Sequence, residues 1–190
     1  MILGKLVALG PILPVDLPTL FRWADDVGEA RLNEPYRPQN WHQQEAFWTN
    51  AANDRTRVFF AIRTANDPAI IGYVQIINID PVHRSATIGI RIGEPSHRGQ
   101  GKGREALTLA IDYCWNHLNL SRIALSVFAE NRRAIELYAR LGFHHEGLLR
   151  QAVFIDGAWI DMVLMALLHP GRDGAAPRAA DAHANSATRD

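Results

Sequence analysis

Three glycines stand at every second position, Gly99, Gly101 and Gly103, between two segments of different periodicity. Before them, in residues 85–92, apolar side chains alternate with polar or small ones, which is the period of a strand. After them, up to residue 118, apolar side chains recur at the spacing of one helix face. Glycine weakens regular structure, so its repetition at a helix start indicates a backbone that approaches another group closely. We therefore expect a strand, a glycine loop and a helix within an α/β fold.

The remaining periodicity predicts a mixed α/β sheet in one domain, residues 1–170. Strands are expected at about 5–10, 57–63, 69–79, 85–92 and 122–128, and in a final hairpin that turns at Asp156 and Gly157. Besides the helix after the glycines, helices are expected at about 15–27, 41–52 and 131–141. Residues 171–190 contain no aromatic or branched aliphatic side chain, so we expect a disordered tail there.

Composition narrows the classes of function. The chain has 20 lysines and arginines against 20 aspartates and glutamates, and no basic stripe carries interleaved aromatics, so a nucleic-acid partner is not expected. No apolar run approaches the roughly 20 residues of a membrane helix. Prolines interrupt the apolar start of the chain, which we interpret as a strand rather than a secretion signal. The single cysteine, Cys114, excludes an intramolecular disulfide and favours a cytoplasmic protein.

The glycine loop has the chemistry of a phosphate site. A helix N-terminus offers unpaired backbone N–H groups and about half a unit of positive charge. Arg98, Lys102 and Arg104 lie around the glycines, so we expect a phosphate or pyrophosphate ligand. Two common loops do not fit. A P-loop needs Ser or Thr after Lys102, where Gly103 stands, and the dinucleotide fingerprint needs GxGxxG, where this chain has GxGxG.

Another loop pattern fits this stretch. Residues 98–103, "RGQGKG", resemble the (Q/R)xxGx(G/A) loop that binds the acetyl-CoA pyrophosphate in GNAT-superfamily N-acetyltransferases. Residues 130–143, "ENRRAIELYARLGF", resemble the Asn-x-x-Ala-Ile-x-x-Tyr helix of the same superfamily. Within it the chain is most similar to the branch of ribosomal-protein alanine and spermidine N-acetyltransferases, as in "VHRSATI" and "FIDGAWIDMVLM". The resemblance covers nearly the whole chain before residue 171.

This resemblance implies a fold and a cofactor site. The fold is a mostly antiparallel central sheet of about seven strands, flanked by helices and splayed between the fourth and fifth strands. Acetyl-CoA lies in that gap, with its pantetheine arm paired to the backbone of Arg91, Ile92 and Gly93 as an added strand would be. No metal is implied. The other residues implied to bind the cofactor are Arg98, Gly99, Gln100, Gly101, Lys102, Gly103, Arg104 and Asn131.

Tyr138 is the implied catalytic residue. The superfamily places at this helix position the acid that protonates the departing CoA thiolate, although Tyr138 also fits the apolar stripe of its helix. Asn131 has two compatible roles, since asparagine is a favoured helix N-cap and the superfamily's asparagine contacts the cofactor. The adjacent His144 and His145 point to opposite faces of a strand and have no metal-ligand spacing.

The sequence leaves several candidates for the general base and for the residues that bind the acceptor. An alkyl ammonium group, with a pKa of about 10.4, attacks only after losing a proton. Glu34, His83 and Glu146 are candidate bases, as is a water chain, and His83 also fits a hairpin turn. "NEPYRP", residues 33–38, resembles a polyamine-binding segment of the spermidine enzymes, so Glu34, Tyr36 and His83 are the candidate acceptor-binding residues. A nearby set of acidic side chains suits a cationic acceptor or a solvated helix face: Asp25, Asp26, Glu29 and Glu34.

The predicted function is acetyl transfer from acetyl-CoA to a primary amine in a ternary complex. A polyamine, a protein N-terminus, an amino sugar or another small amine remains open as the acceptor. The alternative is a non-catalytic acyl-CoA-binding or sensing module on the same fold, against which the presence of Tyr138 argues. The resemblance also implies a homo-oligomer, most often a dimer.

Overall fold

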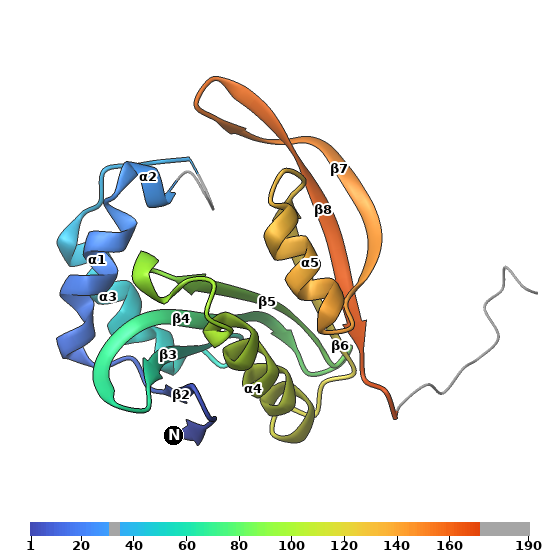
Figure 1. Ribbon diagram of the computed structural model, residues 1–190, viewed down its shortest axis with the longest axis horizontal. Helices are drawn as coiled ribbons and strands as arrows, with labels where there is room; N and C mark the ends of the chain where they lie inside the picture. The colour runs from blue at the N-terminus through green and yellow to red at the C-terminus, as the bar shows by residue number, and fades with distance from the viewer. Residues whose placement is uncertain (31–34, 172–190) are drawn as a thin grey trace, which may run out of the picture.

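The protein is built around one twisted sheet. The computed structural model describes residues 1–30 and 35–171. Within these residues the sheet has eight strands in the order β1-β2-β3-β4-β5-β6-β8-β7 (Figure 1). β5 and β6 are parallel, and the other neighbours are antiparallel. The strands are β1 (Ile2–Leu3), β2 (Val7–Gly10), β3 (Val58–Thr64), β4 (Asp67–Asp80), β5 (Ser85–Ile92), β6 (Arg122–Phe128), β7 (His144–Ile155) and β8 (Ala158–Leu168).

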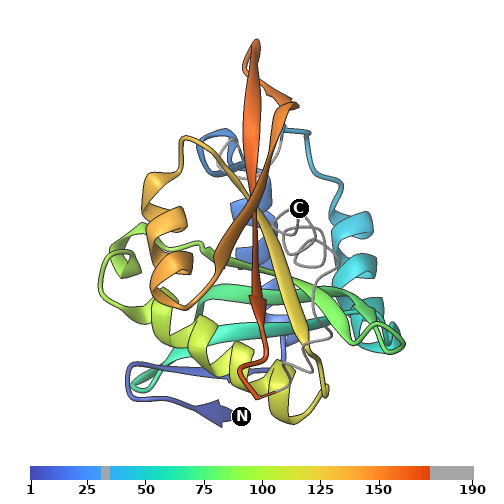
Figure 2. The ribbon, with the colours of Figure 1, turned by 90° about the vertical axis from the view of Figure 1, so that its right-hand side faces the viewer.

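Helices cover both faces of the sheet. They are α1 (Leu17–Ala24), α2 (Val27–Ala30), α3 (Trp41–Asn50), α4 (Lys102–Asn116) and α5 (Arg132–Arg140). Figure 2 shows α4 and α5 grouped on one side of the molecule and α3 on the opposite side. Adjacent β3 residues follow this division, because Ile62 packs in the core with Leu107 of α4 while Ala61 packs with Leu20 of α1. No helix in the described part of the chain is long and apolar enough to cross a membrane.

The predicted local signals produce the expected turns and caps. Asn131 caps α5, because its side chain accepts a hydrogen bond from Ala134 N at 3.1 Å. Gly142, with φ of +92°, follows the end of α5 in the left-handed region that favours glycine. Asp156 and Gly157 have φ of 51° and 80° and connect β7 to β8, which confirms the predicted hairpin.

The sheet opens between β5 and β6. These strands pair over three positions only, Ser85–Thr87 against Arg122–Ala124, and β6 continues paired to β8. Because β5 runs on to Ile92, its edge facing β6 pairs with no strand of residues 1–30 and 35–171 beyond Thr87. Counted from β2, β5 and β6 are the fourth and fifth strands, so the predicted splay is confirmed.

The start of the chain differs from the single strand expected at about 5–10. Two strands, β1 and β2, flank a turn whose backbone is held by the Glu105 carboxylate of α4. Glu105 accepts hydrogen bonds from Lys5 N at 2.8 Å, Leu6 N at 2.6 Å and Val7 N at 2.8 Å. A carboxylate about a hundred positions away satisfies three backbone donors at once, so the chain turns where local pattern predicted extension.

Candidate active site

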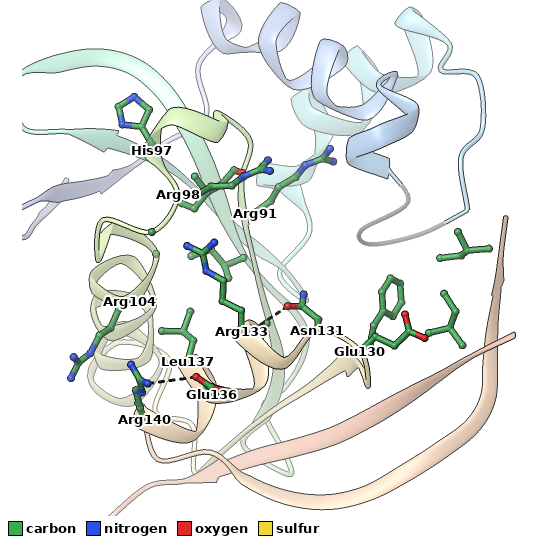
Figure 3. A pocket seen from close by; sticks show the side chains of 18 of the residues that line it. Arg91, His97, Arg98, Arg104, Glu130, Asn131, Arg133, Glu136, Leu137 and Arg140 are labelled. Carbon is green, nitrogen blue, oxygen red and sulfur yellow. Dashed lines mark hydrogen bonds and ion pairs between the residues drawn. The ribbon is translucent and has the colours of Figure 1, made fainter. Parts of the chain in front are cut away.

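A cavity of about 1030 Å³ lies at the splay of the sheet. Its walls are the end of β5, the glycine loop, the start of α5 and the tip of the β7–β8 hairpin (Figure 3). Ligand-binding cavities commonly measure about 300–1,000 Å³, so this one accommodates a large ligand. Segments far apart in the sequence therefore meet at the place where β5 and β6 separate.

The glycine loop presents backbone donors to this cavity. Gly99 and Gly101 both have φ of +79°, and Gly101 is the N-cap of α4 with no side-chain capping bond. The helical ladder begins with Glu105 N donating to Gly101 O at 3.0 Å, so the N–H groups of residues 102–104 precede it. Such a helix start binds anions through its N–H groups and its dipole. Glycine is therefore favoured at positions 99 and 101 because the loop requires a left-handed backbone there.

The cavity brings together most of the residues that the sequence selects for the cofactor. Its lining includes Arg91, Ile92, Arg98, Gly99, Gly101, Gly103, Arg104 and Asn131. Among the described residues that define the lining, Gly93, Gln100 and Lys102 are not included. Lys102 Nζ instead lies 2.6 Å from His97 Nδ1 and donates to Gln100 Oε1 at 2.9 Å. These two side chains therefore bridge parts of the loop to each other.

The end of β5 is held by hydrogen bonds within the protein. Gly93 N donates to Ile71 O at 3.0 Å, which occupies one of the backbone donors expected to pair with pantetheine. Arg98 Nε donates to Ile92 O at 2.9 Å, and Arg98 Nη2 donates to Gly93 O at 3.2 Å. The first arginine of the loop pattern thus fixes the junction between β5 and the loop, a role that its sequence position did not indicate.

A second set of contacts joins α1 to the same junction. A Cβ on Gly93 would lie 2.2 Å from two ring atoms of Trp23, so glycine is required for the indole to pack there. Trp23 Nε1 donates to Glu94 Oε1 at 3.2 Å, and Arg22 Nη2 donates to the same oxygen at 2.5 Å. Arg91 Nη2 donates to Trp23 O at 2.6 Å. Partial burial acts to raise the pKa of Glu94, but the hydrogen bonds from Arg22 and Trp23 outweigh it and hold that pKa below its ordinary value.

Tyr138 lies in the core behind the wall of the cavity. Its side chain is 7% exposed, and its ring packs edge-on against Phe143 with centroids 5.7 Å apart. Ala134 and Leu137 of the same helix line the cavity, whereas Tyr138 is not among the lining residues found in the described chain. Burial raises the pKa of Tyr138 to about 12, so its hydroxyl keeps its proton throughout the physiological range.

Among the candidate acceptor residues that the structure describes, neither Tyr36 nor His83 lines the cavity. Tyr36 donates to Asp25 Oδ1 at 3.3 Å, beside the end of α1, and Glu34 lies outside the described residues. His83 occupies the turn before β5, at the opposite end of that strand from the glycine loop, where its N–H donates to Asp80 Oδ1 at 2.8 Å. Glu146, the third candidate base, forms an ion pair with Arg122. The structure therefore does not bring His83 or Glu146 into the cavity.

Several lining residues were not selected from the sequence. Glu136, Arg140 and Arg133 project from the face of α5 toward the cavity, at a helical spacing that the apolar stripe of the same helix obscured. Ile90, His97, Ala134 and Leu137 were also missed, although they lie on elements that the sequence had placed at the site. The remaining missed residues come from the end of β6, the loop after it and the hairpin tip, and they meet the cavity only through the topology of the sheet. They are Phe128, Glu130, Ile155, Asp156, Ala158, Trp159 and Ile160.

A family model described as an acetyltransferase (GNAT) domain matches residues 7–144. The chain belongs to the GNAT acetyltransferase family. Spermidine N(1)-acetyltransferase of Vibrio cholerae is 36% identical to this GNAT chain over 137 residues, which are 72% of the chain and 77% of the relative. Ribosomal protein uS5 alanine N-acetyltransferase of Escherichia coli is 32% identical over 136 residues, 70% and 69% of the two chains. The GNAT branch that the motifs indicated is thereby confirmed.

A solved structure agrees with these relatives. The crystal structure of spermidine N-acetyltransferase from Vibrio cholerae in complex with CoA and spermine matches this GNAT enzyme with a TM-score of 0.80 at 30% identity. The match covers 87% of this chain and 96% of that chain. The protein is an N-acetyltransferase that acetylates amines with acetyl-CoA as acyl donor.

The residues of the cavity fit acetyl-CoA. The left-handed glycines and the start of α4 form an anion cradle, and Arg98, Arg104 and Arg133 add positive charge around it. The β5 edge beyond Thr87 has no strand partner, so it suits an amide-rich pantetheine arm. In the described part of the chain, no three His, Cys, Asp or Glu side chains gather in a way that could hold a metal ion.

Proposed function

We propose that this enzyme acetylates a small cationic primary amine of the polyamine type, by direct transfer while both substrates are bound. The observation that carries the proposal is the distribution of charge along one continuous cavity. Its glycine-loop end is lined by Arg98, Arg104 and other arginines, whereas the carboxyl groups of Glu130 and Asp156 line the part near the hairpin tip. A polyanionic nucleotide and a cationic amine therefore find opposite ends of the same space.

An exposed aromatic side chain supports the acceptor assignment. Trp159 lines the cavity and is 60% exposed, and its ring contacts Phe154 at a centroid distance of 5.2 Å. An indole face attracts alkyl ammonium groups by cation–π interaction. Two of the similar proteins, from Vibrio cholerae and Escherichia coli, are spermidine N(1)-acetyltransferases. A flexible polyamine, with several ammonium groups, suits this rim of carboxylate and aromatic groups better than an amino sugar, which carries one.

We assign separate tasks to the residues around the reacting atoms. Acetyl-CoA supplies an activated thioester carbonyl, and the backbone N–H groups at the glycine loop hold its pyrophosphate. Tyr138 acts as the general acid for the departing thiolate, and its raised pKa of about 12 keeps the proton in place until it is needed. Tyr138 follows Leu137 on α5, and Leu137 lines the cavity, so the phenol stands next to the wall of the donor site.

The test is a thiol-release assay with acetyl-CoA and a panel of acceptors. The panel contains spermidine, a peptide with a free N-terminal alanine and glucosamine. Spermidine-dependent release that exceeds release with the peptide and the sugar supports the proposal. Release with the peptide alone would assign the enzyme to protein N-termini. Binding of acetyl-CoA without release by any acceptor would favour the sensing module instead.

We further propose that the enzyme forms a homo-oligomer through the β7–β8 hairpin. Figures 1 and 2 show that this hairpin projects beyond the rest of the molecule. Leu148, Leu149 and Phe154 on it are each 46% or more exposed, and such apolar patches mark association surfaces. The spermidine N-acetyltransferase of Vibrio cholerae has a dodecameric structure. Light scattering after gel filtration measures the assembly; a monomer at micromolar concentration would refute it.

A further inference from the structure

The β7–β8 hairpin contains an irregularity between its base and its tip. Leu149 pairs with Met162. The next pair is Val153 with Ile160, so β7 advances by four residues where β8 advances by two. The bulged stretch includes Gln151, whose φ is 51°. Bulges bend a strand pair and increase its twist, and in Figure 1 the hairpin bends between its base and its tip. The bulge therefore sets the direction of the tip.

One residue of β8 holds this bulge on one side and the end of β6 on the other. The Asp161 side chain accepts a hydrogen bond at Oδ1 from Gln151 N at 2.7 Å. Its backbone oxygen accepts a hydrogen bond from Ala129 N, just after β6, at 2.9 Å. An N–H in a bulge lies outside the regular ladder, so a carboxylate acceptor satisfies it and fixes the bulge. Asp161 therefore connects the direction of the hairpin tip to the neighbouring wall of the cavity.

The tip beyond the bulge is a regular hairpin that carries part of the acceptor rim. Phe154 pairs with Trp159 and Ile155 with Ala158, and the rings of the first pair lie 5.2 Å apart between centroids. Trp159 lines the cavity, as does Glu130 in the loop after β6. Because the tip is regular, a change in the bulge would turn the Trp159 ring relative to Glu130 without altering either side chain.

We propose that Asp161 is a positioning residue for the acceptor, which keeps the Trp159 indole at the rim of the cavity by holding the bulge. This inference rests on the proposed polyamine acceptor. Among the described residues that define the lining, Asp161 is not included, so it acts through Trp159 rather than by contact with substrate. A cation must lie over the indole face, within about 6 Å of the ring centroid, so the orientation of the ring decides how well an ammonium group binds.

The experiment measures acetyl transfer from acetyl-CoA to spermidine for variants of the full-length protein. We expect Asp161→Ala to raise the KM for spermidine about fivefold and Trp159→Ala about tenfold, with kcat and CoA affinity within about twofold of wild type. The double variant should lose no more than Trp159→Ala alone, because one residue acts through the other. Asp161→Leu removes the acceptor oxygen but keeps the volume of the side chain, so it should behave as Asp161→Ala does.

Two variants separate positioning from other roles. Asp161→Asn keeps an oxygen that accepts the Gln151 bond, so its KM should stay within about twofold of wild type. If Asp161 instead attracted spermidine by its charge, the Asn variant would lose as much as the Ala variant, and the proposal would be wrong. Glu146→Ala is the matched control. Glu146 lies on the same hairpin, pairs with Arg122 and is not part of the lining that the described residues define, so its loss should leave KM unchanged.

Amide hydrogen exchange at Gln151 tests the hydrogen bond without any acceptor. We expect faster exchange in Asp161→Ala than in wild type or Asp161→Asn. Unchanged exchange, or additive losses in the double variant, would overturn the role of Asp161 and leave the polyamine assignment intact. A wild-type enzyme that does not acetylate spermidine would overturn the polyamine assignment, and with it the task given to Asp161, whatever the exchange shows.

Discussion

Alanine substitutions at Gly101 and Gly103 should change stability in opposite directions, although the two residues are two positions apart. Gly101 has φ of +79°, where an L-residue costs about 1–2 kcal/mol. A Cβ there meets only Leu6 at 3.5 Å, so the cost comes from the backbone rather than from crowding. Gly103 lies within α4, and its added Cβ would make ordinary contacts with Ile92 at 3.7 Å and Ile90 at 3.8 Å.

The magnitudes follow from these conformations. Alanine reduces the freedom of the unfolded chain, so Gly103→Ala should stabilise by about 0.5–1 kcal/mol. Gly101→Ala should destabilise by about 1 kcal/mol after the same gain is subtracted from the strain. For a domain of this size, about 1 kcal/mol shifts the melting temperature by about 2–4 °C. The two variants should therefore melt on opposite sides of the wild type.

Gly101→Ala and Gly103→Ala also distinguish two effects on CoA binding, a changed backbone conformation of the loop and the volume of an added methyl group. Relief of strain in Gly101→Ala would rotate the N–H groups at the start of α4, so CoA affinity should fall at least about tenfold. In Gly103→Ala the methyl group rests against β5 and the N–H groups keep their directions, so CoA affinity should stay within about threefold. The GNAT loop pattern itself accepts alanine at this second position. Thermal unfolding and calorimetry measure both effects. A Gly101→Ala protein that is as stable as wild type and binds CoA equally well would refute the reasoning.

Three further outcomes are expected. Tyr138→Phe should lower turnover about 100-fold or more with CoA affinity unchanged, and full activity in the thiol-release assay would return Tyr138 to a purely packing role. Glu105→Ala should destabilise by about 1–3 kcal/mol because three backbone donors lose their acceptor. Partial burial acts to raise the pKa of Glu105, but those hydrogen bonds lower it overall. The stability that Glu105 contributes is therefore complete above the ordinary carboxyl pKa and is lost as pH falls through the lowered value. The melting curves of Glu105→Ala and wild type should converge in acid. Truncation after Pro170 should leave melting temperature and activity unchanged, since the last strand ends at Leu168, and a large drop would show that the tail contributes to the fold.

Local chemistry explains which parts of the fold were predictable. The alternation in β5, the cap at Asn131 and the turn at Asp156 and Gly157 depend on neighbouring residues, so the sequence carries them directly. The glycine loop was predictable for the same reason, because its backbone conformation and its donors arise within six residues.

Contacts between distant segments were not predictable. Glu105 holds backbone groups of residues 5–7, and Trp23 fills the space left by Gly93; neither contact has a local signature. Trp159 reaches the cavity only because β8 lies between β6 and β7 in the sheet. Contacts of this kind depend on the order of the strands in the sheet, and the spacing of motifs along the sequence does not reveal that order.

The junction between α1 and β5 has a consequence for exchanging parts among GNAT enzymes. Exchanging the segment after α1 between GNAT enzymes requires a boundary that preserves the contacts between α1 and the end of β5. Trp23 must stay with Gly93 and Glu94 in such an exchange. Replacing Trp23 would leave a void above Gly93 and would remove a hydrogen-bond donor from Glu94, which lies just before the glycine loop. A graft that begins after Asp25 retains the indole and its partners. The boundary of such an exchange therefore belongs between the end of α1 and the start of α2.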